Sequence, residues 1–289
     1  MKKHFSTIFA VAVILFGVGI FFYPNISNWY MQKHQGGVIQ EYNKQTEEMP
    51  KEEIKEIKKE VRAYNDNLVN NRTILTDPFD EEAWNTLSSS YEDLLNVNGV
   101  MAYIEIPEID VYLPVYHGTD KETLEKGIGH LQNTSFPIGG KGTHCVLSGH
   151  SGLPTAMLFT NLDQLKKGNR FYIHVLDEVL AYKVDQIEVV EPEDISLLAI
   201  DPNEDYVTLV TCTPFGKNTH RLLVRGTRTK YDRDKLKKDR KDAQDKSLWE
   251  RLKDLFRHRS LALQVLGAGI GIVLAVCIYE LVIKKRWKR

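Results

Sequence analysis

Two residues nine positions apart could support nucleophilic chemistry. Cys212 closes a β-branched, apolar run that starts at Tyr206, and Arg221 opens a second such run that continues to Arg228. The insert between them, Pro214–Asn218, is rich in turn-forming residues, so the two runs predict a β-hairpin. Pairing the runs would bring the thiol and the guanidinium to the same end of a sheet. A thiol beside a fixed cation can serve a reaction in which negative charge develops.

Both residues also have ordinary structural interpretations. A lone cysteine at a strand end is usually a small buried hydrophobe, and an arginine at a strand edge is usually solvated. A third residue favours chemistry. His150 lies in the turn Gly149–Gly152, directly after a predicted strand at Thr143–Leu147. A thiol, an imidazole and a guanidinium that all follow or open strands together indicate a nucleophilic site.

These three residues stand in motifs of a known family. Thr208–Cys212 reads Thr-Leu-Val-Thr-Cys, which resembles the sortase signature Thr-Leu-x-Thr-Cys. Arg221 stands where sortases have their active-site arginine, and His150 in Gly-His-Ser-Gly resembles the sortase histidine. The similarity extends over about 77–228. Thr-Cys-Thr-Pro-Phe-Gly, followed by the Asn-Thr-His-Arg run that ends at Arg221, is most similar to the class C, pilus-assembling branch.

The resemblance implies transpeptidation through a thioester, without a cofactor. Sortases cut a signal resembling Leu-Pro-x-Thr-Gly after the threonine. Cys212 would attack that carbonyl as a thiolate, Arg221 would hydrogen-bond the substrate or the oxyanion, and His150 would protonate the leaving amine. Class C members use a lysine amine of a pilin subunit as acceptor. Two alternatives stay open: a sortase that anchors surface proteins to a cell-wall precursor, and a catalytically silent, membrane-tethered binding module.

A short segment far upstream carries a further class C feature. Asp77, Pro78 and Phe79 precede a helical pattern over Glu82–Leu95. Asp-Pro is a turn former, and such an aspartate is commonly only a cap or turn residue. Beside the sortase resemblance, the tripeptide is similar to the class C lid over the active site. That resemblance implies that Asp77 lies against Arg221 and that Phe79 covers the Cys212 sulfur.

Composition limits the other functions. The 289 residues carry 27% charged side chains and a formal net charge of −1, which gives no global bias toward nucleic acid. The three cysteines, Cys145, Cys212 and Cys277, make no disulfide framework. His144, Cys145 and His150 do not predict a metal site, because adjacent strand residues point to opposite faces. Cys145 is expected in the core, and His220 is expected to be structural and to point away from Arg221.

Two apolar runs predict membrane anchoring. Phe5–Tyr23 follows a short basic flank, and Leu261–Ile283 precedes a basic tail at Lys284–Arg289. A cleaved signal peptide is the alternative for the first run. Basic outer ends place both termini in the cytoplasm and the catalytic domain on the extracellular face of a Gram-positive-type cell membrane. Basic residues just before the second span oppose that orientation: Arg251, Lys253, Arg257 and Arg259.

The strand pattern predicts a mostly β fold, and the resemblance selects a closed sortase-type barrel with short helices, preceded by a lid-bearing helical region and flanked by transmembrane helices. The expected domains are an anchor at 1–24, a helical region at 25–98, the barrel at 99–228, a charged linker at 229–259 and a second span with its tail at 260–289. The predicted strands are Met101–Ile106, Val111–Val115, Thr143–Leu147, Arg170–Val175, Leu180–Val190, Tyr206–Cys212 and Thr219–Thr227. Helical turns are expected at Lys121–Gly127, Thr160–Lys167 and Glu193–Ile200, and one amphipathic helix within Val38–Asn70.

Overall fold

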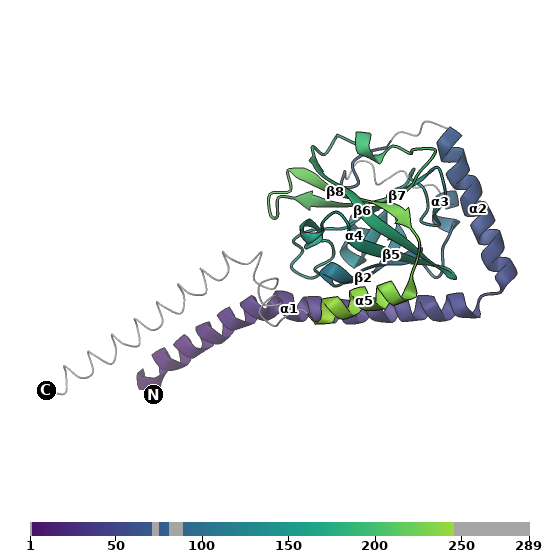
Figure 1. Ribbon diagram of the computed structural model, residues 1–289. Coiled ribbons are helices and arrows are strands. Elements are labelled where there is room, and N and C mark those ends of the chain that lie inside the picture. Colours follow the sequence, from purple (N-terminus) through teal and green to yellow (C-terminus); the bar gives the residue numbers. More distant parts are fainter. Residues whose placement is uncertain (1, 71–74, 81–88, 246–289) are drawn as a thin grey trace. The chain divides into compact units, whose positions relative to one another are not determined.

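The computed structural model describes residues 2–70, 75–80 and 89–245 (Figure 1). The chain divides into two compact units, one made of Met1–Trp29 with Lys246–Arg289 and the other of Tyr30–Asp245. In the first unit only the beginning of helix α1 (Lys2–Glu48) is described, and it contains the predicted first span. Within the described ranges no helix has the length and apolarity that crossing a membrane requires. The predicted second span and basic tail lie outside those ranges.

The second unit contains a closed eight-stranded barrel, which confirms the mostly β, barrel part of the predicted fold class. The strand order around the barrel is β1-β2-β3-β4-β7-β8-β6-β5. The strands are β1 (Ala102–Ile106), β2 (Val111–His117), β3 (Ile128–His130), β4 (Thr143–Ser148), β5 (Arg170–Val175), β6 (Glu178–Val190), β7 (Asp205–Thr213) and β8 (His220–Thr229). All seven predicted strands are present. The sequence missed β3, because three residues are too few to show alternation, and only its pairing with β2 and β4 makes it a strand.

Residues alternate between the two faces of the barrel wall. Leu209 of β7 lies in the main core inside the barrel, whereas its neighbour Val210 belongs to a separate apolar cluster. We call this second set the outer cluster, since successive side chains of a strand point to opposite faces. Its members are Leu131, Val146, Leu198, Val210 and Leu223, with Leu75, Phe79, Val190, Ile195 and Leu197 packed against them. Cys212 follows Val210 by two positions and therefore shares the outer face of β7.

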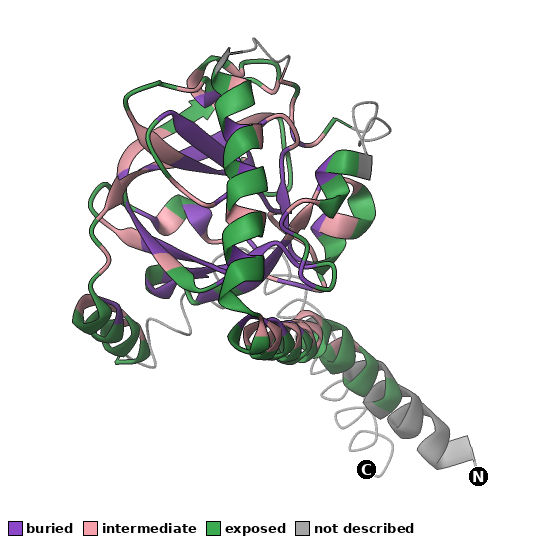
Figure 2. Cartoon of the chain, turned by 90° about the vertical axis from the view of Figure 1, so that its right-hand side faces the viewer, coloured by how far each residue is buried: buried purple, intermediate pink, exposed green. Residues whose placement is uncertain are grey.

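Two helices, rather than the single predicted one, lead into the barrel. The break is at Pro50, which separates α1 from α2 (Lys51–Asn70). Proline lacks a backbone N–H and disfavours helical geometry in the residue before it, so α1 ends there. The Tyr42 hydroxyl ties α1 to the barrel by donating to the Met101 carbonyl at 3.2 Å and accepting from the Leu176 N–H at 2.9 Å. Figure 2 shows α2 across one side of the barrel, with its outer face exposed.

Short helices connect the strands. The segments are α3 (Ser89–Asp93), α4 (Lys121–Lys126) and the 3-10 helices η2 (Pro107–Ile109), η3 (Leu162–Gln164) and η4 (Ser196–Leu198). The helical turn expected at Lys121–Gly127 is present as α4. The helical turns expected at Thr160–Lys167 and Glu193–Ile200 are present only as the shorter 3-10 helices η3 and η4. Only the last part of the pattern Glu82–Leu95 is described, and it contains α3.

The predicted charged linker at 229–259 is wrong over residues 233–244. These residues form helix α5 (Arg233–Gln244), which begins where the Asp232 side chain accepts two backbone N–H groups. Leu236, the helix's one buried residue, packs against Tyr172 and Ala181 of the barrel. The sequence shows only a run of charges here, because two of the partners that hold the helix, Glu105 for Arg240 and Tyr172 for Asp239, lie on distant strands.

An ion pair fixes α5 to the barrel. Arg240 of α5 binds both carboxylate oxygens of Glu105 in β1, and Nε2 of His174 in β5 lies 3.0 Å from the same carboxylate. Tyr172 adds a hydrogen bond from its hydroxyl to Asp239 at 2.8 Å. Burial acts to raise the pKa of Glu105, but the hydrogen bonds from Arg240 and His174 outweigh it and hold that pKa below its ordinary value of 4.5.

We predict that Arg240→Ala lowers the free energy of unfolding at neutral pH by about 1–3 kcal/mol, because a buried carboxylate loses its two charged hydrogen bonds. A carboxylate whose pKa is depressed in the fold stabilises the protein above its ordinary pKa, and this contribution disappears as pH falls through the lowered value. The difference between variant and wild type should therefore shrink below pH 4.5.

Urea unfolding at several pH values measures this difference. Lys237→Ala is the control, because Lys237 lies on the same helix with its side chain 63% exposed. Equal stability of wild type and Arg240→Ala at neutral pH would show that the ion pair does not hold the helix.

Candidate active site

The predicted cysteine and arginine face each other across two paired strands. β7 and β8 are antiparallel, and their register places Cys212 directly opposite Arg221. Side chains of directly opposed residues lie on the same face, here the outer face of the barrel. Cys212 is 9% exposed, and the Arg221 side chain is 11% exposed. The hairpin inferred from the sequence thus does bring the two groups together.

Parallel pairing brings the histidine to the same edge. β4 runs parallel to β7, with Ser148 in register with Val210, so the turn after β4 meets the last residues of β7. Three hydrogen bonds hold this turn against β7. The Gly149 N–H donates to the Val210 carbonyl at 3.1 Å. The Thr211 hydroxyl donates to the Gly149 carbonyl, and the Ser151 hydroxyl to the Cys212 carbonyl, each at 2.7 Å.

These bonds lie on both sides of His150 and therefore hold its backbone beside the last residues of β7. Thr211 and Ser151 were not among the residues predicted to have a role in the site. Thr211 belongs to the recognised motif Thr-Leu-Val-Thr-Cys, and Ser151 belongs to Gly-His-Ser-Gly. Their places in these motifs were the sequence signal that could have pointed to them. What the sequence could not show is that each hydroxyl bonds to the other motif's backbone.

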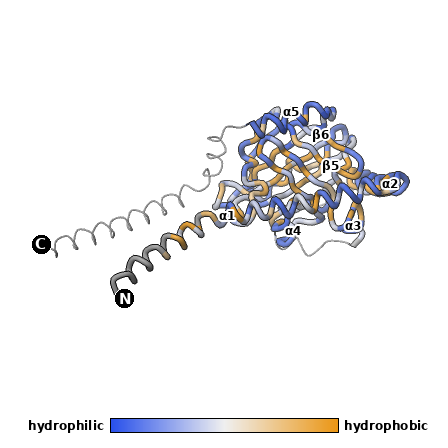
Figure 3. Tube along the Cα trace, turned by 90° about the horizontal axis from the view of Figure 1, so that it is seen from below, coloured by the Kyte–Doolittle hydropathy of each residue, from blue (hydrophilic) through white to orange (hydrophobic). Residues whose placement is uncertain are grey.

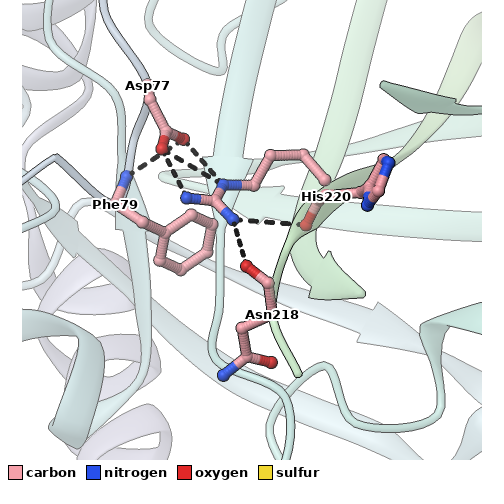
Figure 4. Close-up of polar contacts among 5 residues, drawn as sticks. Asp77, Phe79, Asn218 and His220 are labelled. Atoms are coloured by element: carbon pink, nitrogen blue, oxygen red, sulfur yellow. Dashed lines mark hydrogen bonds and ion pairs between the residues drawn. The ribbon is translucent and has the colours of Figure 1, made fainter. Parts of the chain in front are cut away.

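Asp77 binds the arginine from the upstream segment (Figure 4). The Arg221 Nε donates to Oδ1 of Asp77 at 2.9 Å and to Oδ2 at 3.2 Å, and a terminal nitrogen donates to Oδ2 at 2.5 Å. The other terminal nitrogen donates to the carbonyls of Asn218 and His220 at 3.1 and 3.2 Å. The guanidinium is therefore occupied by a bidentate carboxylate on one side and by its own hairpin on the other.

The Phe79 ring lies over the same edge. Its centroid is 5.7 Å from that of the His150 ring, and the guanidinium carbon of Arg221 is 5.1 Å from the Phe79 centroid. The ring also packs against the outer cluster. The segment turns sharply at Pro78, where the Asp80 N–H donates to the Asp77 carbonyl at 3.1 Å. Phe79 thus contacts the histidine and the arginine, while its expected contact with the Cys212 sulfur stays a prediction.

The closed arrangement favours neutral forms of both reactive groups. Burial raises the pKa of the Cys212 thiol, and the Asp77 carboxylate adds to this rise while Arg221 opposes it. Burial lowers the pKa of His150. For Arg221 burial acts downward, but the hydrogen bonds to Asp77 outweigh it and raise the pKa. A thiolate and an imidazolium are therefore both disfavoured while Asp77 and Phe79 cover the site.

The remaining candidates lie elsewhere. His144 is buried, and burial lowers its pKa to about 4. Its Nδ1 donates to the Ala199 carbonyl at 2.9 Å, and its Nε2 accepts from the Thr208 hydroxyl at 2.7 Å. Cys145 is in the main core, as expected. His220 faces Glu191 at 3.1 Å. Among the described residues no three His, Cys, Asp or Glu side chains form a cluster that could hold a metal. Cys277 lies outside the described residues.

Known proteins share this fold and these motifs. A family model described as Sortase domain matches residues 104–229. Sortase C-1 from Streptococcus pneumoniae is 47% identical, and its crystal structure matches with a TM-score of 0.65 over 68% of this chain and 100% of that chain. This chain belongs to the sortase family. The sortase is also similar to a solved structure titled "Pilus-related Sortase C of Group B Streptococcus", at 44% identity over 66% of this chain and 97% of that chain, with a TM-score of 0.62.

Among curated relatives, Sortase D of Bacillus subtilis is 30% identical over 128 residues, which cover 43% of this chain. The match spans 62% of that relative's own length. The resemblance drawn from the sequence motifs is therefore confirmed, including the similarity of this sortase to class C members.

We predict that Asp77→Asn shifts the pH profile of Cys212 alkylation by iodoacetamide to lower pH. The Asp77 charge raises the thiol pKa, so its removal increases the thiolate fraction at any given pH. Phe79→Ala should instead raise the plateau rate with a smaller shift of the midpoint, because the ring covers the site without carrying charge.

Alkylation rates across pH separate the two effects, since the midpoint reports the thiol pKa and the plateau reports access. Asp80→Asn, which removes a neighbouring acid of the same segment, is the matched control. An unchanged midpoint in Asp77→Asn would mean that the carboxylate does not act on the thiol.

Proposed function

We propose that this sortase is a membrane-anchored transpeptidase of the class C kind, which joins pilin subunits. The observation that carries the proposal is the bidentate contact of Asp77 with Arg221, with Phe79 beside it against His150. These contacts hold an Asp-Pro-Phe segment against two of the three groups that the reaction needs, Arg221 and His150. The relative whose title calls it pilus-related supports the same assignment.

The acylation step follows from the positions of the three groups. The Cys212 thiolate attacks the threonine carbonyl of a Leu-Pro-x-Thr-Gly-like signal, and a C–S bond forms. Arg221, once released by Asp77, hydrogen-bonds the oxyanion that develops. The His150 imidazolium gives its proton to the leaving glycine amine as the C–N bond breaks. The product is a thioester between Cys212 and the threonine.

An amine then resolves the thioester. The ε-amine of a pilin lysine attacks the thioester carbonyl, an isopeptide C–N bond forms, and the thiolate of Cys212 leaves. His150 takes the proton from the attacking amine and is ready for the next cycle. No group other than these three side chains and the two substrates is needed for the atoms and protons to balance.

The covering segment, which we call the lid (Asp77, Pro78 and Phe79), must move before this chemistry. Its ion pair is largely buried, with side chains 11% and 12% exposed. Opening would remove the carboxylate that raises the Cys212 pKa and free the guanidinium for substrate. A sorting signal would favour the open state by binding only there.

Membrane anchoring rests on the first part of α1. Its side chains Leu15, Phe16 and Ile20 are 60–72% exposed, and Figure 3 shows the hydrophobic character of this described stretch. Exposed aromatic residues follow at Tyr23 and Trp29, as at the interface of a bilayer with water. We propose the lipid bilayer as the partner of this helix, with the catalytic unit on the extracellular face. A cleaved signal peptide is the alternative.

Topology is tested by adding protease to intact cells whose wall has been removed. We expect degradation of the region between the two predicted spans, 38–246, while tags at both termini stay protected. Cleavage of the carboxy-terminal tag from outside would contradict the arrangement with two spans.

The catalytic assignment predicts a graded series of variants. Cys212→Ala should abolish the thioester. Arg221→Lys should lower turnover by about 10²–10³-fold, because an ammonium cannot reproduce the planar fork of donors. Cys145→Ala is the matched control and should leave turnover nearly unchanged, since this thiol is in the core. Mass spectrometry of the acyl-enzyme with a signal peptide measures each variant. An active Cys212→Ala would mean that the nucleophile is another residue.

The acceptor decides between the two sortase roles. The full-length protein and a signal peptide are supplied with a pilin subunit in one reaction and with a wall-precursor amine in the other. We expect the isopeptide product with the pilin. Product only with the wall precursor would favour the wall-anchoring alternative, and no acyl-enzyme with any substrate would favour the non-catalytic module.

A further inference from the structure

A hollow of about 690 Å³ lies on the barrel away from the reactive edge. The residues that line it include Arg62, Gly139, Gly140, Asp205, Arg228 and Lys230. The lining comes from α2, from the loop before β4, from the start of β7, and from the end of β8 with the residues that follow it. In Figure 1 the end of β8 and α2 lie on the same side of the barrel.

Cations dominate this hollow. Arg62, Arg228 and Lys230 carry positive charge, and Asp205 is the only acid in the lining. Asp205 is already occupied by other donors: the Gly140 N–H at 2.8 Å and the Tyr182 hydroxyl at 2.9 Å. Within the described part of the chain, neither Arg62 nor Lys230 takes part in an ion pair. The hollow therefore keeps a net positive charge of about two.

Arg228 is held in place by its surroundings. A terminal nitrogen donates to Asp205 at 3.3 Å, and its guanidinium carbon is 5.6 Å from the Tyr182 ring centroid. Gly139 leaves the space that the guanidinium needs, because a Cβ there would lie 2.3 Å from the same terminal nitrogen. The positive φ of Gly139, 66°, also favours glycine. The backbone thus accommodates an arginine that is fixed at the wall of the hollow.

The hollow is separate from the reactive thiol. Asp205 begins β7, and Cys212 lies near the other end of the same strand. Seven residue steps along a strand correspond to about 23 Å. A group bound in the hollow therefore cannot take part in the transfer at Cys212.

We propose that this hollow binds a phosphate group. Three cations from two segments, α2 and the end of β8 with the residues after it, line one open cavity, and the surplus of two charges matches a phosphate dianion. The fixed fork of Arg228 would bind the oxygens in one plane, and Arg62 and Lys230 would approach from α2 and from the segment after β8. An open hollow leaves room for a larger molecule that bears the phosphate. The proposal does not depend on the reaction assigned to Cys212.

Calorimetric titration of the full-length protein in a nonionic, phosphate-free detergent tests the site. Inorganic phosphate is one probe and glycerol phosphate the other, so that free phosphate is distinguished from an organic phosphate. Lys230→Gln and Arg62→Gln should each weaken binding by about three- to five-fold. Lys167→Gln is the control, because it removes one exposed lysine of the η3–β5 turn, which does not line the hollow.

Lys230→Gln, Arg62→Gln and Lys167→Gln should all transfer the acyl group of a signal peptide at the wild-type rate. An unchanged rate also shows that each variant is folded. Tighter binding of glycerol phosphate than of inorganic phosphate would identify an organic phosphate as the ligand. Failure of both probes to bind would overturn the proposal. So would an equal loss in Lys167→Gln, or binding of succinate with the same affinity, since the latter would indicate a site for any dianion.

Discussion

The register between β7 and β8, combined with the parallel pairing of β4 with β7, is the constraint on which the site depends. One pairing sets Cys212 opposite Arg221, and the other brings the His150 turn to the last residues of the same strand. A shift by one residue would turn the thiol into the main core. The buried alternation of Val207 and Leu209 prevents such a shift, so the packing of the barrel interior also holds the chemistry on its outer face.

Because the reactive groups lie on an outer face, something else must exclude water from them. The outer cluster and the lid do so in the closed form. Phe79 packs against that cluster. Asp77 neutralises the charge of the Arg221 guanidinium and also raises the pKa of the Cys212 thiol. The closed form therefore disfavours the thiolate of Cys212. In the proposed reaction the lid would have to open before Cys212 could react.

The helices outside the barrel are attached to it by different kinds of interaction. α1 and α2 attach through buried hydroxyl and amide groups, such as Tyr42, and Asn65, which exchanges two hydrogen bonds with the Phe136 backbone. α5 attaches mainly through charge, with Arg240 on the buried Glu105. The positively charged hollow lies between α2 and the segment that leads to α5.

The family, seven of the eight strands and the catalytic candidates could be predicted from the sequence, because β alternation and short motifs are local properties of the chain. Asp77, too, was expected beside Arg221, although only the family resemblance suggested that pairing. The remaining features depend on how the folded chain packs. β3 exists only through its partners, α5 depends on Glu105 more than a hundred residues away, and the hydroxyls of Ser151 and Thr211 act across two strands. Each of these features depends on contacts between segments that are far apart in the sequence. A local sequence pattern does not show which distant residues will be in contact.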